Sequence, residues 1–219
     1  EVHATSAYGT TYHIYATFAD PTDECIALYS IGTAEEGSVD LSLDVTTSFY
    51  QHPAGSNLGS GLSGFFITLV PELAYDSWLT IGSETSDDGP VSSIGMSDAF
   101  ASFSTGGGFV LNGETGGSWY VTPASNPSAL AGDDGRVLLA QLTAADDAEG
   151  NAGHVVCDWN LQWRDVSGVS SNVIGLLVDT SDSPVDIAGC MDVSACNYDA
   201  AATTDDGSCA TLDACGVCG

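Results

Sequence analysis

Apolar and polar residues alternate along most of this 219-residue chain. In the segment 38–49, Val39, Leu41, Leu43 and Val45 alternate with polar side chains. A period of two residues is typical of a β-strand that buries one face and exposes the other. The same pattern, or a short apolar run, predicts further strands over residues 11–19, 25–31, 64–70, 77–82, 108–113, 118–122, 136–143, 154–163 and 172–179.

Turn-forming sequences separate these segments, and helical periodicity is scarce. One short helix is predicted over residues 97–103, with Ser97 as its N-cap. Parallel strands need crossover helices, for which the chain leaves no room. The fold class is therefore predicted as all-β, an antiparallel β-sandwich or jelly-roll-like domain with a small disulfide-rich C-terminal tail.

A polar, proline-bearing stretch over residues 179–188 is typical of a linker. We expect a β-sandwich domain over residues 1–184, with the boundary near Pro184. A Cys- and Asp-rich segment stapled by disulfides is expected over residues 185–219. The chain begins at Glu1 without a methionine and ends within a cysteine pattern, which we interpret as a trimmed start and a cut end.

The charge balance excludes several classes of partner. The chain has 30 acidic residues against two basic ones, Arg136 and Arg164, and a formal net charge of −28. Binding to nucleic acid or to an anionic membrane surface needs cations that this chain lacks. No apolar run approaches the length of a membrane span, so membrane insertion is not expected. An acidic surface suits a saline or calcium-containing medium, where ions screen its self-repulsion.

Seven cysteines indicate an oxidising compartment. Five lie in the last thirty residues, and only Cys215 and Cys218 have the close spacing of zinc ligands. We therefore favour disulfides over zinc. Cys25 and Cys157 either pair across the body or stay as buried thiols. If they pair, the odd number left in the tail requires a free thiol or a bond to other sequence. The disulfide candidates are Cys25, Cys157, Cys190, Cys196, Cys209, Cys215 and Cys218.

Catalytic motifs are not found, and we predict that the protein is not an enzyme. The histidines His3, His13, His52 and His154 lack metal-binding spacing, and no G-x-S-x-G motif is present. Adjacent aspartates fall in turns, where they stay solvated rather than facing each other across a cleft. Aromatic residues displayed on one face are able to stack on sugar rings, so glycans are an alternative partner. The aromatics considered are Tyr8, Tyr12, Tyr15, Tyr50, Trp78, Trp119, Tyr120, Trp159 and Trp163.

The tail resembles a repeat of large, modular, secreted surface proteins of aquatic bacteria and algae. Gly189-Cys190, Ala195 to Asp199 and Asp205 to Cys209 match its Gly-Cys, Ala-Cys-Asn-Tyr-Asp and Asp-Asp-Gly-Ser-Cys elements. Cys215 to Gly219 matches the Cys-Gly-Val-Cys-Gly module that often follows. The resemblance implies an extracellular or cell-surface setting and supplies no catalytic residues.

Oxygen-bearing side chains of the tail suit a calcium ion, although their spacing is not that of an EF-hand loop. The candidate calcium ligands are Asp192, Asn197, Asp199, Asp205 and Asp206.

We therefore expect a secreted structural protein, the repeating subunit or module of an extracellular filament, stalk or surface coat, that self-associates into a homopolymer. The alternative is a monomeric adhesin or carbohydrate-binding module. An edge strand is the expected means of assembly, by strand addition. The candidate strand comprises Asn172, Val173, Ile174, Gly175, Leu176, Leu177 and Val178.

Overall fold

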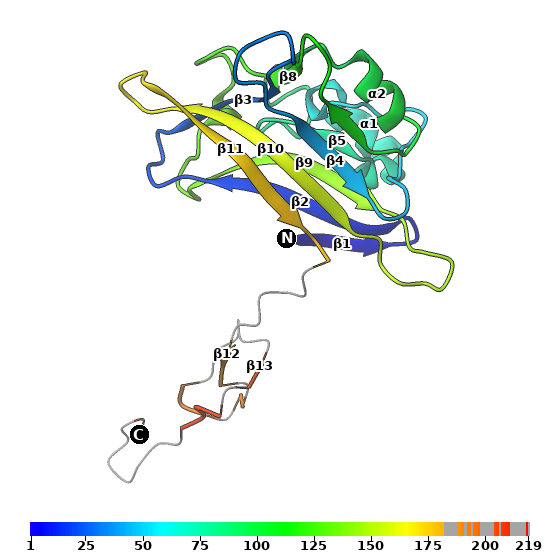
Figure 1. Ribbon diagram of the computed structural model, residues 1–219. Coiled ribbons are helices and arrows are strands. Elements are labelled where there is room, and N and C mark those ends of the chain that lie inside the picture. Colours follow the sequence, from blue (N-terminus) through cyan, green and yellow to red (C-terminus); the bar gives the residue numbers. More distant parts are fainter. Residues whose placement is uncertain are drawn as a thin grey trace. The chain divides into compact units, whose positions relative to one another are not determined.

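The computed structural model describes residues 1–181, 188–190, 192–193, 195–197, 204–205, 207–210 and 218 (Figure 1). These residues form two compact units, Glu1–Asp179 and Thr180–Gly219. The first unit consists mainly of two antiparallel sheets and the second contains two disulfides, which confirms the predicted fold class. The boundary predicted near Pro184 lies outside the described residues.

The smaller sheet of the body has four strands in the order β1-β2-β9-β5. Its long central pair, β2 and β9, keeps an antiparallel register from Thr10 opposite Ala144 to Thr17 opposite Arg136. The strands are β1 (Val2–Ser6), β2 (Gly9–Thr17), β9 (Arg136–Ala144) and β5 (Trp78–Leu79).

The larger sheet has seven strands and forks along one edge of β10. Residues 161–164 of β10 pair with β3, whereas residues 155–158 pair with β4. The opposite edge of β10 pairs with β11 over almost its whole length. The strands are β6 (Ser92–Ile94), β8 (Gly117–Tyr120), β3 (Glu24–Ser30), β10 (Val155–Arg164), β4 (Leu41–Val45), β7 (Phe109–Leu111) and β11 (Ser170–Asp179).

The main core lies between the two sheets. Alternate residues of β9, Val137 and Leu139, face the larger sheet. Trp119 and Trp159 meet edge to face at its centre, with ring centroids 5.5 Å apart. The Trp119 indole donates to the carbonyl oxygen of Thr80 at 3.1 Å, so this buried N–H is satisfied.

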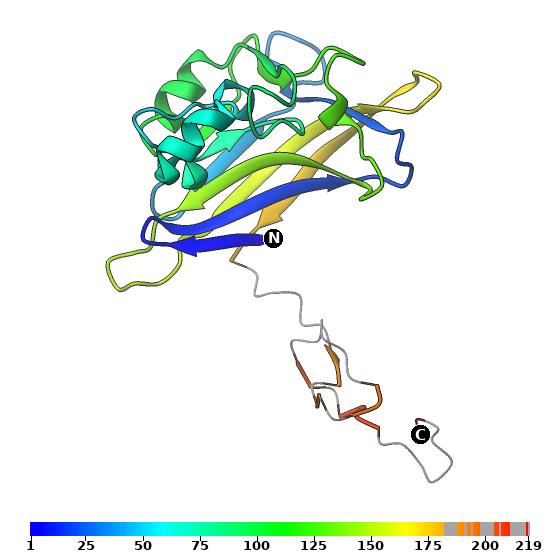
Figure 2. The ribbon, with the colours of Figure 1, turned by 180° about the vertical axis from the view of Figure 1, so that it is seen from behind.

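Helix α1 (Gly64–Leu69) and the short 3-10 helices next to it in the sequence cover the outer face of the smaller sheet (Figure 2), whereas Phe103 of α2 (Ser97–Phe103) packs in the main core. Helix α1 packs Ile67, together with Val70 just after it, against a second cluster that contains Trp78 and Leu138. The strand predicted over residues 64–70 is therefore wrong. An apolar run of this length fits a strand or a helix equally well, and within the described part of the chain it pairs with no strand. The short 3-10 helices are η1 (Gly59–Gly61), η2 (Pro71–Tyr75) and η3 (Pro127–Ala129).

The helix predicted over residues 97–103 is confirmed as α2 (Ser97–Phe103). Its N-cap is Met96, without a side-chain capping bond, so the assignment of Ser97 as N-cap is wrong. Ser97 is the first helical residue instead.

The second unit contains a two-residue parallel pair, β12 (Ala188–Gly189) with β13 (Thr204–Asp205). Two disulfides, Cys190–Cys209 and Cys196–Cys218, close loops within it. With so little apolar surface to bury, such cross-links are the main means of holding a short segment together.

Candidate functional site

β11 is an edge strand of the larger sheet. It pairs with β10 from Asp179 opposite Val156 to Ser170 opposite Arg164. Among the residues that the structure describes, β10 is the one strand paired with it. Over residues 170–178, the other edge of β11 is therefore paired with no strand of the described part of the chain, the feature by which sheets add further strands.

A bulge interrupts this free edge. Trp159 pairs with Leu176 and Leu161 with Val173, so Ile174 and Gly175 both lie opposite Asn160. Gly175 has a φ of +70°, a left-handed conformation that glycine adopts without strain. The bulge divides the edge into two four-residue stretches, 170–173 and 176–179.

The side chains of β11 make the edge apolar on both faces. Leu176 and Val178 pack against the core. Leu177 is 69% exposed and Ile174 is 51% exposed. Residues 166–178 contain no charged side chain, although the chain as a whole carries a net charge of −28. Natural edge strands usually carry charged residues that discourage association, and β11 carries only one, Asp179, at its last position.

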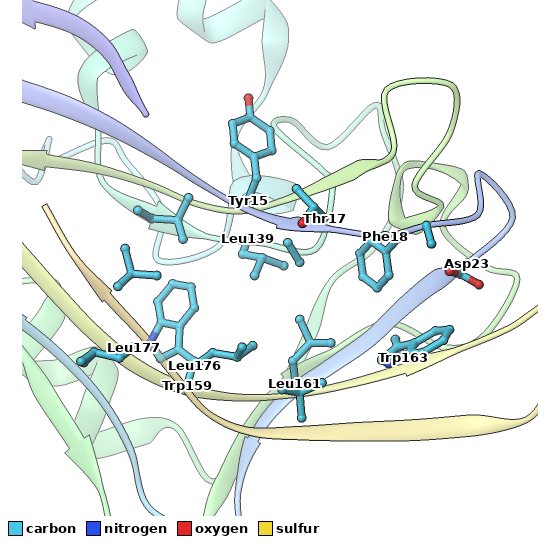
Figure 3. Close-up of a pocket in the computed structure, with 15 residues that line it drawn as sticks. Tyr15, Thr17, Phe18, Asp23, Leu139, Trp159, Leu161, Trp163, Leu176 and Leu177 are labelled. Carbon is cyan, nitrogen blue, oxygen red and sulfur yellow. The ribbon is translucent and has the colours of Figure 1, made fainter. Parts of the chain in front are cut away.

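An unfilled apolar cavity of about 380 Å³ lies beside β11, between the edges of the two sheets (Figure 3). We call it the β11 slot. The slot opens here because β1 pairs with only the first part of β2 and leaves the edge of its second part uncovered. The pairing ends where Val2 lies opposite Tyr12 and the His13 amide donates to the Glu1 carbonyl. The slot is lined by Ile14, Tyr15, Ala16, Thr17, Phe18, Ala19, Asp23, Leu139, Trp159, Leu161, Trp163, Val173, Leu176, Leu177 and Val178.

Aromatic rings dominate one end of the β11 slot. Phe18 and Trp163 meet edge to face with centroids 6.0 Å apart, and Figure 3 shows both rings near Asp23. Trp159 is 2% exposed, and its indole nitrogen has no hydrogen-bond partner among the described residues. The slot therefore suits apolar or aromatic side chains better than polar ligands.

The two body cysteines are buried thiols, so of the two alternatives left open by the sequence it is the unpaired one that the structure shows. Cys25 and Cys157 belong to the same sheet, where Cys25 lies opposite Trp163, six residues along β10 from Cys157. At the rise of a strand this is a separation of about 20 Å, too far for a disulfide. Burial raises the pKa of both thiols, which leaves them unreactive at neutral pH.

In the tail, four of the five cysteines form the two disulfides. Cys215 lies outside the described residues.

The structure describes only some of the five predicted calcium ligands. Asp192 and Asn197 are exposed, while Asp199 and Asp206 lie outside the described residues. Of Asp205 only the backbone, in β13, is described. The Asn197 amide donates to the Ser208 carbonyl at 2.7 Å and its oxygen accepts from the Ala210 amide at 2.8 Å. Within the described part of the chain, no three His, Cys, Asp or Glu residues group as a metal site.

The aromatic residues considered for sugar stacking do not form an exposed platform. Tyr12, Trp78, Trp119 and Trp159 are buried, and the other five are half-buried. Tyr8 stacks on Tyr50 at 4.1 Å, so these rings cover each other. The most exposed aromatics of the body are instead Phe65 and Phe66 of α1, which the strand prediction over residues 64–70 did not single out.

Comparison of the chain with protein-family models, with curated proteins and with solved structures gives no match. Of the helices that the structure describes, none has the length and apolarity to cross a membrane.

Proposed function

We propose that this chain is a secreted structural protein, the repeating subunit or module of an extracellular filament, stalk or surface coat. It associates with further copies of itself on the side of the body formed by β11. The observation that carries the proposal is the edge of β11 from Ser170 to Val178, which has no charged side chain and is apolar from Val173 onward. In a chain this acidic, two copies meet with least repulsion where carboxylates are few, and here they are limited to Asp158 on β10 and Asp179 at the end of β11.

Secretion is supported by the chemistry of the tail. The disulfides Cys190–Cys209 and Cys196–Cys218 are of a kind that persists in oxidising compartments. The high negative charge suits a medium in which salt screens it.

The bulge at Gly175 shapes how copies meet. Strand addition along all of β11 is interrupted there, since each straight stretch of the edge has only four residues. Side chains at the rim, above all Leu177, therefore contribute to the contact together with backbone pairing. Addition of a strand at β11 remains a prediction.

Negative-stain electron microscopy and sedimentation of the purified chain in saline, calcium-containing buffer test this function. We expect filaments with a fixed axial repeat. The Leu177→Glu variant places a charge on the edge and is expected to remain monomeric. Val110→Glu is the matched control, because Val110 is 57% exposed on a strand away from β11. Dispersed wild-type particles at all concentrations would refute a polymer, and glycan-array binding would then test the adhesin alternative.

A further inference from the structure

A filament of identical copies that is built by a single type of contact requires two different surfaces to meet. A contact of one surface with itself closes into a two-fold dimer, whereas a head-to-tail contact propagates. The inference below rests on the proposed function, because it takes a second copy of this chain as the partner. The β11 slot of one copy must then meet a different surface of the next copy.

Helix α1 presents the complementary surface. Phe65, Phe66 and Leu69 are 67%, 56% and 61% exposed, and we call these three side chains the α1 knob. The opposite face of the helix is anchored to the body, because Ile67 and Val70 pack against the cluster that contains Trp78 and Leu138. Exposed aromatic pairs of this kind are uncommon on a protein surface unless a partner covers them.

The charge pattern favours another copy of this chain as that partner. Residues 45–71, which include the α1 knob, contain no acidic or basic side chain except His52, and residues 166–178 at the slot contain none. An anionic membrane would be repelled by the rest of a chain of charge −28. Few carboxylates lie at the two surfaces: Asp23 is the one acidic residue in the slot lining and is already 6% exposed, and Asp87 lies near Gly64 at the start of α1.

We propose that the α1 knob of one copy seats in the β11 slot of the next. The slot, about 380 Å³ in volume, is open and walled mainly by aliphatic and aromatic side chains, with Thr17 and Asp23 among the lining residues. An incoming phenylalanine meets Phe18 and Trp163, whose rings already adopt the edge-to-face arrangement that aromatic clusters prefer. Aromatic side chains seated in such desolvated pockets usually dominate binding energy.

The positions of the two surfaces allow the contact to repeat. The α1 knob lies in the helical layer on the outer face of the smaller sheet, whereas the slot opens between the sheets beside β11 (Figures 1 and 2). A copy that uses its knob therefore leaves its slot free for another copy. The contact covers the rim residue Leu177, which unites it with the β11 edge of the proposed function.

A mixing experiment with two full-length variants tests the contact. The knob variant is Phe65→Ser with Phe66→Ser, and the slot variant is Thr17→Trp. Thr17 is an exposed residue that lines the slot on the β2 side, so its replacement fills the slot without altering β11. Val110→Ser and Thr33→Trp change exposed residues elsewhere and serve as controls. Circular dichroism and thermal unfolding confirm that each variant folds.

We expect each variant alone to need a concentration at least about tenfold above wild type before it polymerises. An equimolar mixture should form one-to-one dimers by sedimentation, because the intact knob of one variant fits the intact slot of the other. Variants that polymerise like wild type would overturn the knob-and-slot contact and leave the proposed function standing. Single variants that fail and are not rescued by mixing would overturn it as well. Wild-type protein that never polymerises would instead refute the proposed function.

Discussion

Asn160 shows how one residue sets the geometry of the candidate site. It is 1% exposed and lies where the larger sheet forks. Its amide donates to the carbonyls of Tyr29 at 3.0 Å and Asp40 at 2.6 Å, on the two branches. Its oxygen accepts from the Gly175 amide at 3.0 Å. One side chain therefore satisfies backbone groups at the end of β3, before β4 and in the bulge of β11.

Replacing Asn160 with alanine should destabilise the body strongly. Three backbone groups would lose their partner in a buried position, at a cost of about 3 kcal/mol in the free energy of unfolding. Urea unfolding measures the change. Gln162→Ala is the control on the same strand, since this residue is only half-buried and bonds to the Asn172 side chain. Equal destabilisation by both variants would contradict the role of Asn160.

We expect His13 to make the stability of the smaller sheet sensitive to acid. Its Nε2 lies 2.9 Å from the Gln141 amide oxygen, its Nδ1 lies 3.2 Å from the Tyr15 hydroxyl, and the His3 ring stacks on it at 3.8 Å. Burial lowers the pKa of His13, and the charge of His3 acts in the same direction, while the Gln141 bond and Glu1 oppose it.

Because the pKa of His13 is lower in the folded state, the unfolded chain takes up a proton first as pH falls. The contribution of His13 to stability is present above about pH 6.5, the pKa of histidine in the unfolded chain. It is lost as the pH falls below that value. We expect the melting temperature of His13→Gln to change less between pH 7.5 and 5 than that of wild type. His52→Gln should behave as wild type. An unchanged pH profile in His13→Gln would show that other groups control the acid response.

At the scale of elements, side-chain alternation was sufficient for the long strands. β2, β9, β10 and β11 all fall within two residues of their predicted limits. β1 and β6 were missed because Val2–Ser6 and Ser92–Ile94 lack an apolar face, so neighbouring strands determine their conformation. The strand predicted over residues 64–70, where α1 lies, was wrong for the opposite reason. Its apolar residues fit the period of a strand and the period of a helix equally well.

The bulge of β11 depends on glycine at position 175. A methyl group there would meet only Asp158 at 3.9 Å, so space is not limiting, but the φ of +70° is unfavourable for other residues. Gly175→Ala should reduce the free energy of unfolding by about 1 kcal/mol, and Gly175→Asn by less. Gly113→Ala is the control, because its surroundings are open and its φ is not positive. No effect of Gly175→Ala in thermal unfolding would show that the bulge relaxes easily.

At the scale of the whole molecule, the sequence predicted one part of the candidate site, the β11 strand, but not the β11 slot beside it. The apolar run Asn172–Val178 indicated a strand, and its place before the linker made an edge plausible. The β11 slot requires β2 and β11, which are more than 150 residues apart in the chain, to lie on the same side of the sandwich. The choice between paired and free Cys25 and Cys157 stayed open for the same reason, because periodicity does not specify which strands share a sheet.

Calcium binding by the tail is a prediction that titration calorimetry can test. Asp192 is exposed, and the oxygen-rich sequence around it suits calcium with an affinity of about 10⁻⁴ to 10⁻³ M, as in extracellular modules. Asp192→Asn should weaken binding, whereas Asp133→Asn in a turn of the body should not. Identical heats for wild type and Asp192→Asn would exclude Asp192 as a ligand.

Salt should promote assembly. Each copy carries a net charge of −28, so approaching copies repel each other over distances set by screening, about 30 Å at 0.01 M ionic strength and about 3 Å at 1 M. The proposed contact is apolar, and Arg136 and Arg164 already pair with Glu1 and Glu24. Sedimentation between 0.01 and 1 M NaCl should therefore show polymers forming at lower protein concentration as salt rises. The Leu177→Glu variant should stay dispersed throughout, since screening removes repulsion but does not restore the apolar contact. Polymers that dissolve as salt increases would mean that ion pairs between copies hold them together, and the apolar edge at β11 would not be the contact.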